Sequence, residues 1–119
     1  MKDEDKRRYA RLGAFLEGAF ETENGLHGLV MLTNFSREGF RAYLNRRIDA
    51  GCLIKLEIWL PGSIVPVFIS GKVIWLKKSA YDWTYHFEAG LKNEEMDVDD
   101  RHRMMEYVYE HWRSARVRR

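Results

Sequence analysis

The 119-residue sequence predicts a mainly β fold, a six-stranded antiparallel barrel followed by one C-terminal α-helix. Three observations predict it. Short segments of alternating or β-branched residues are separated by turn residues through 12–93. The period then changes to that of an amphipathic helix over 97–117. A length of 119 residues and a hydrophobic content of 45% suit one domain, 1–119, with a flexible arginine-bearing arm at 1–11.

The predicted strands occupy the first three quarters of the chain, at 12–21, 28–33, 39–44, 53–60, 65–76 and 84–91. The fourth has the clearest pattern, because every second residue from Ile54 to Leu60 is aliphatic, as in a half-buried strand. Gly71 lies inside the fifth segment and predicts a bend or a β-bulge there.

The last quarter of the chain predicts a helix. Asp97 or Asp99 is a suitable N-cap, and the acidic residues of 94–100 suit the positive end of a helix dipole. Apolar residues then recur at helical spacing, and this stripe is predicted to pack on the barrel. The stripe consists of Met105, Val108, Trp112 and Ala115.

Composition excludes several classes of protein. No apolar run approaches the roughly 20 residues that span a bilayer, and no signal-type apolar stretch follows the charged N-terminus, so we expect a cytoplasmic protein without membrane insertion. Cys52 is the only cysteine, which rules out an internal disulfide and a cysteine-rich zinc site. Phosphate-loop, nucleophile-elbow and paired-acid patterns are missing. We therefore expect a non-enzyme without metal or cofactor.

Two short patterns stand out together. Arginines lie four residues apart at Arg7 and Arg11, just before the first predicted strand. Residues 34–39 read Asn-Phe-Ser-Arg-Glu-Gly and form the turn before the third. In this combination the chain resembles the PilZ domain family, which is marked by Arg-x-x-x-Arg followed by (Asp/Asn)-x-Ser-x-x-Gly.

The resemblance covers most of the chain. Residues 73–75, Val-Ile-Trp, are similar to a Val-x-Trp strand of the family, and residues 89–92, Ala-Gly-Leu-Lys, to its Gly-(Val/Leu)-Lys strand. Asn93 stands where the family usually has an aromatic residue, a difference that we expect to affect packing rather than the ligand motifs.

The resemblance implies a bacterial receptor for the second messenger cyclic di-GMP. Arg7 and Arg11 would grip the ligand, since a guanidinium fork bonds guanine O6 and N7 or two phosphate oxygens. Asn34 would recognise a guanine edge, because its amide both accepts and donates. Ser36 would donate its hydroxyl to a base or phosphate, and Gly39 would allow close backbone approach or a positive φ.

Three further residues are secondary candidates. Arg8 and Lys6 would assist through phosphate contacts or stacking. Trp75 either borders the site as a stacking surface or is a core aromatic, and the sequence favours the core.

The expected mechanism is a switch in which the arm folds over the barrel on binding and a separate, unidentified protein reads the change. Motility, exopolysaccharide or secretion pathways fit the resemblance. One alternative is a protein-interaction adaptor of the same fold that binds no nucleotide. Another is a barrel that binds single-stranded nucleic acid through Arg37, Arg41, Arg46 and Arg47. The favoured interpretation expects neither DNA nor RNA.

Overall fold

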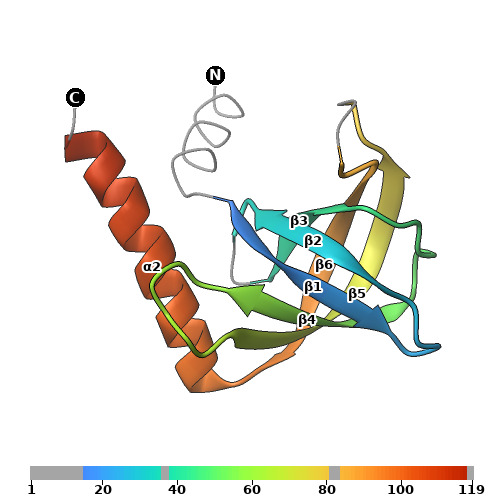
Figure 1. Ribbon diagram of the computed structural model, residues 1–119, viewed down its shortest axis with the longest axis horizontal. Coiled ribbons are helices and arrows are strands. Elements are labelled where there is room, and N and C mark those ends of the chain that lie inside the picture. The colour runs from blue at the N-terminus through green and yellow to red at the C-terminus, as the bar shows by residue number, and fades with distance from the viewer. Residues whose placement is uncertain (1–14, 36–37, 81–83, 118–119) are drawn as a thin grey trace.

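The structure is a computed structural model that describes residues 15–35, 38–80 and 84–117, with side chains up to residue 111. The elements are β1 (Leu16–Thr22), β2 (His27–Thr33), β3 (Gly39–Leu44), β4 (Leu53–Trp59), β5 (Val67–Lys78), β6 (Phe87–Met96) and α2 (Val98–Val117). The strands close into an antiparallel barrel in the order β1-β2-β3-β6-β5-β4, with the helix at one side (Figure 1). The predicted barrel with a C-terminal helix is confirmed.

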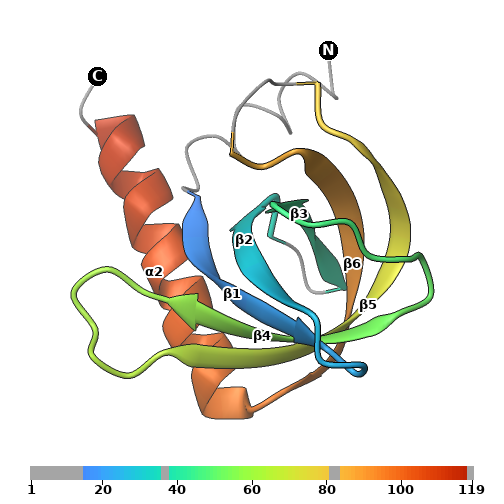
Figure 2. The ribbon, with the colours of Figure 1, turned by 45° about the vertical axis from the view of Figure 1, so that its right-hand side comes forward.

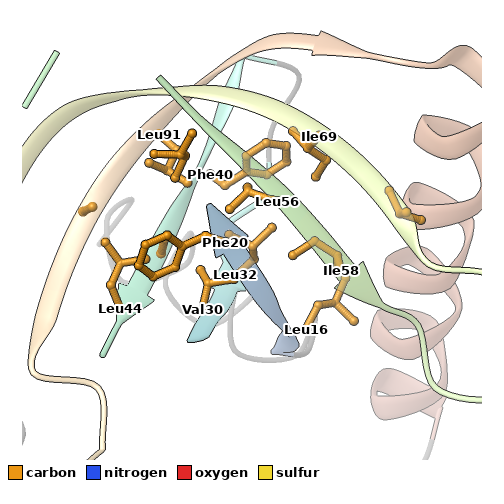
Figure 3. Packing of buried hydrophobic residues seen from close by; sticks show 14 of the residues in the cluster. Leu16, Phe20, Val30, Leu32, Phe40, Leu44, Leu56, Ile58, Ile69 and Leu91 are labelled. Carbon is orange, nitrogen blue, oxygen red and sulfur yellow. The ribbon is translucent and has the colours of Figure 1, made fainter. Parts of the chain in front are cut away.

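Alternation along the strands directs one face of each into the barrel. On β4, Ile54, Leu56 and Ile58 are at most 1% exposed, as their period-2 pattern predicts. The rings of Phe20 and Phe40 lie in the interior among aliphatic side chains from every strand (Figure 3). Burial of each such side chain contributes about 1.5–3 kcal/mol, so the interior is the main source of stability.

The largest difference from the predicted strands is in β6, which continues past Leu91 to Met96. Its polar second half was not recognised as a strand. Beyond Lys92, β6 no longer pairs with β3 and pairs only with β5. Main-chain hydrogen bonds to β5 therefore maintain this half of the strand. Its side chains are mostly not buried in the core, so the sequence there needs no alternation of apolar residues.

Asp97, the first of the two candidate caps, is the N-cap of α2, which begins at Val98. Its Oδ2 accepts the backbone N–H groups of Asp99 at 3.0 Å and of Asp100 at 3.4 Å. Asp99 lies inside the first turn, where its negative charge interacts favourably with the positive end of the helix dipole.

The predicted packing face of α2 was wrong at Met105, which is 37% exposed, whereas the adjacent Met104 is 1% exposed. Tyr107 and Val108 complete the contact with the core, and the side chains of Trp112 and Ala115 lie outside the described residues. Hydrogen bonds from Arg103 of α2 to the β4–β5 loop help to set how the helix is rotated about its axis. The spacing of apolar residues does not predict these hydrogen bonds, and the adjacent Met104 and Met105 fit that spacing almost equally well.

Candidate functional site

An open groove of about 600 Å³ crosses the outside of the barrel where β3, β6 and β5 lie side by side. Its volume falls in the range of small-molecule sites. The lining residues come from the turn before β3 and from these three strands: Asn34, Glu38, Gly39, Phe40, Arg41, Ile74, Trp75, Gly90, Leu91 and Lys92.

The turn before β3 has a specific backbone conformation. Asn34 is half-buried and has a φ of 53°, in the left-handed region that asparagine and aspartate adopt more readily than other non-glycine residues. The ring of Phe35 meets that of Phe40 edge to face, with 6.0 Å between centroids. The backbone requirement at Asn34 thus gives a local reason for an amide or carboxylate there, and the aromatic pair holds the described start of the turn against the barrel.

Gly39 is required by close approach rather than by a positive φ. A Cβ at this position would lie 2.1 Å from the carbonyl oxygen of Leu91, which is backbone and cannot move aside. Of the two sequence-based explanations, the structure supports the first, because the glycines with positive φ are others. The β3–β6 contact that forms one wall of the groove therefore depends on the missing side chain.

Trp75 lies on the groove and not in the core, so the core interpretation is wrong. Val73 pairs with Leu91 and Trp75 pairs with Gly90, which leaves Ile74 as an extra residue on β5. This β-bulge places Ile74 and Trp75 in succession on the outer side, where they are 51% and 38% exposed.

The indole of Trp75 lies across Gly90. A Cβ on Gly90 would meet the indole Nε1 at 2.3 Å, so the missing side chain makes room for the ring. The Lys77 ammonium lies 5.6 Å from the ring centroid, within cation–π range. Sequence reasoning did not propose Gly90 as a site residue, although a glycine inside a strand is a known signal of close approach.

Two cationic side chains, Arg41 and Lys92, line the groove together with the carboxylate of Glu38. Lys92 has a 62% exposed side chain and lies 4.0 Å from Glu94. Arg41 is held by Glu88 of β6, with Nε 3.2 Å from Oε2, and the Glu88 side chain is only 9% exposed. A buried carboxylate of this kind needs its cation, so Arg41 is fixed on the groove wall.

A second bulge and two buried polar atoms lie near the motif turn. The register of β5 and β6 shifts between Ser70 and Gly71, as Gly71 predicted. Asn93, opposite Gly71, donates its backbone N–H to the carbonyl of Glu38 at 2.8 Å, so this departure from the family pattern borders the motif turn. Asn93 Oδ1 and Thr33 Oγ1 are buried, and within the described part of the chain neither has a hydrogen-bond partner.

Comparison of the sequence with known families gives one match. The profile of the PilZ domain matches residues 5–110, nearly the whole chain. The chain belongs to the PilZ domain family. PilZ domains are cyclic di-GMP receptors and act as binding domains rather than catalysts. No curated protein matches the chain significantly.

The structure brings together three of the eight candidate residues for the PilZ ligand, namely Asn34, Gly39 and Trp75. The others, Lys6, Arg7, Arg8, Arg11 and Ser36, lie outside the described residues. Asn34 and Trp75 are 41 positions apart in the sequence and line one groove, because β6 lies between β3 and β5 in the barrel.

The described arginines considered for nucleic-acid binding, Arg41, Arg46 and Arg47, do not all line the groove. Of these three, Arg41 is the one that lines it. Both Arg46 and Arg47 lie in the segment after β3. Arg46 donates to the carbonyl of His27, at the start of β2, at 3.4 Å, and Arg47 lies 3.8 Å from Asp49. Arg37 is outside the described ranges.

Two features are absent from the described part of the PilZ chain. No group of three or more His, Cys, Asp or Glu side chains there is arranged to hold a metal ion. None of its helices is long and apolar enough to cross a membrane.

Proposed function

We propose that this PilZ protein is a cytoplasmic, non-enzymatic receptor that binds cyclic di-GMP in the groove between the Asn34 turn and Trp75. The observation that carries the proposal is the meeting of these two elements at one groove bordered by cations. Cyclic di-GMP offers two flat purines with hydrogen-bonding edges and two phosphates. The groove offers an amide, an aromatic ring and positive charge, which match those features.

The proposed contacts follow from side-chain chemistry. The amide of Asn34 accepts and donates along a guanine edge, and the hydroxyl of Ser36 donates to a base or a phosphate. A second purine stacks on the exposed indole of Trp75, a contact worth about 1–3 kcal/mol in comparable sites. In this proposal Lys77, whose ammonium lies 5.6 Å from the ring centroid, and Lys92, which lines the groove, contact phosphate.

The arm supplies the remaining contacts in this proposal. Arg7 and Arg11 close over the groove and grip guanine or phosphate with their planar forks, and Lys6 and Arg8 add phosphate contacts. Binding thereby fixes the arm on the barrel, and a separate protein reads the change. The ligand shifts this equilibrium only by the difference in its affinity for the two states.

Isothermal titration calorimetry with cyclic di-GMP tests the proposal. We expect saturable binding to the full chain that is largely lost in Arg7→Ala and in Arg11→Ala. Arg47→Ala is the matched control, because Arg47 has a 71% exposed side chain and does not line the groove. Unchanged affinity in both arm variants would contradict the assignment of the arm, and absence of binding to the unmodified chain would favour the nucleotide-independent adaptor.

A further inference from the structure

Four large apolar side chains are exposed together at the β4–β5 hairpin, on a side of the barrel that does not line the groove. They are Trp59 at 43% exposed, Ile64 at 98%, Val65 at 61% and Phe68 at 56%, and we call them the hairpin patch. Single exposed apolar residues are ordinary, but adjacent ones that include a fully exposed isoleucine are typical of interaction sites.

The loop that displays Ile64 and Val65 is held in place by α2. The guanidinium of Arg103 donates to Ser63 Oγ at 3.1 Å, to the Pro66 carbonyl at 3.3 Å and to the Val65 carbonyl. In Figures 1 and 2 this loop, drawn in yellow-green, lies alongside the helix.

Asp100 completes this support at the start of β5. Its Oδ2 accepts the backbone N–H of Phe68 at 3.2 Å, and its Oδ1 lies 3.0 Å from Arg103 Nη1. The patch is therefore ordered before any partner arrives, which lowers the entropic cost of binding.

Carboxylates accompany the aromatic members of the patch. Glu57 is directly opposite Phe68 in the β4–β5 register, and Glu17 is directly opposite Trp59 in the β1–β4 register. Glu57 Oε2 accepts the indole N–H of Trp59 at 2.9 Å. Both glutamates are exposed, and no lysine or arginine among the described residues forms an ion pair with either.

We propose that the hairpin patch is the docking site for a partner protein whose contacting segment carries large apolar side chains next to lysine or arginine. Charge complementarity selects this occupant. A two-fold contact between copies of this chain would bring the glutamates of both copies together, and an anionic membrane would meet the same repulsion. This inference does not depend on cyclic di-GMP binding, so each proposal can fail alone.

The test is a selection of random short peptides, displayed on phage, against the immobilised full chain. We expect the enriched peptides to combine basic and large apolar residues. Synthetic copies, measured by fluorescence anisotropy, should bind the double variant Ile64→Ser/Val65→Ser about tenfold more weakly or worse. Both side chains are exposed, so the variant retains the fold, which circular dichroism verifies.

Matched controls separate the patch from general stickiness. Leu29→Ser removes an apolar side chain that is 41% exposed on β2 and should leave peptide affinity unchanged. The double variant Glu17→Lys/Glu57→Lys should instead select acidic peptides.

Four results would overturn the proposal. These are the absence of enriched peptides, enriched peptides without basic residues, and peptides that bind the Ile64→Ser/Val65→Ser variant undiminished. The fourth is a different occupant: a dimer in sedimentation velocity that this variant abolishes, or co-sedimentation with phosphatidylglycerol vesicles that it abolishes.

Discussion

Strand β5 carries an exposed aromatic ring near each end, and the two rings are exposed for different reasons. Phe68 points outward by ordinary alternation, between the buried Val67 and Ile69. Trp75 points outward because the bulge at Ile74 adds a residue before it. A regular strand would have turned this tryptophan into the barrel, on the same face as Val73.

The charges around the two rings also differ. Phe68 lies opposite Glu57, whereas Trp75 has Lys77 above its ring and Lys92 in the same groove. The aromatic ring at the groove therefore has two lysines beside it, in a groove that Glu38 also lines, and the ring at the hairpin has a carboxylate opposite it. One strand of the barrel thus borders two surfaces with different charged neighbours. In the two proposals, one surface binds a phosphate-bearing messenger and the other binds a protein partner.

The largest effect is expected from deletions within β5. Deletion of Lys72, which lies between the two register shifts of β5 and β6, moves either Val73 or Ile69, together with the core residues that follow it, to the wrong face. Each misplaced core side chain costs about 1.5–3 kcal/mol, so the loss approaches the stability of a small domain. Deletion of Ile74 instead removes only the extra residue of the bulge, and Trp75 stays opposite Gly90. Urea unfolding measures the free energy of unfolding of both deletion variants. An equal loss of stability in the two would contradict the assignment of Ile74 as the extra residue of a bulge.

A smaller effect is expected at the hairpin end from Arg103→Ala. The variant removes the contacts to Ser63, Val65 and Pro66 and leaves Asp100 without its cation, for a loss of about 1–3 kcal/mol. Hydrogen exchange should become faster at the start of β5. Arg101→Ala is the control on the same helix, and an equal effect of both variants would show that the loop anchor is unimportant.

At the groove end, Trp75→Ala should weaken cyclic di-GMP binding by about 1–3 kcal/mol through lost stacking. Trp59→Ala, which removes a comparably exposed indole from the hairpin end, should leave the affinity unchanged. Calorimetry measures the cyclic di-GMP affinity of both variants. Equal weakening would show that the groove and the hairpin patch are not separate sites.

The smallest effect is a loss of stability at alkaline pH. Burial, followed by the nearby Glu17 carboxylate, raises the pKa of Tyr85, which lies in the connection between β5 and β6. Burial also raises the pKa of Tyr107 on α2. Each folded-state pKa exceeds the ordinary value of about 10, so the neutral phenols contribute full stability below pH ~10 and lose it as pH rises further. The denaturant midpoint should fall less between neutral and alkaline pH in Tyr85→Phe and in Tyr107→Phe than in the unmodified chain.

Sequence patterns were informative where local chemistry and burial agree. The alternation from Ile54 to Leu60, Asp97 as a cap and the register shift at Gly71 were all predictable. The pattern was uninformative in the second half of β6, where main-chain pairing with β5 maintains a strand of polar residues. It was misleading at Met105, because hydrogen bonds from Arg103 to the β4–β5 loop help to set how the helix is rotated about its axis.

By itself, the sequence determined the fold class and the motif turn, since both follow from periodicity and from residue types that act over a few positions. Only the tertiary structure decided that Trp75 faces the groove, that Gly90 makes room for its ring, and that carboxylates border the hairpin patch. These outcomes depend on which residues stand opposite one another across strands distant in sequence. Strand order, register and one extra residue set that pairing, and no local pattern specifies it.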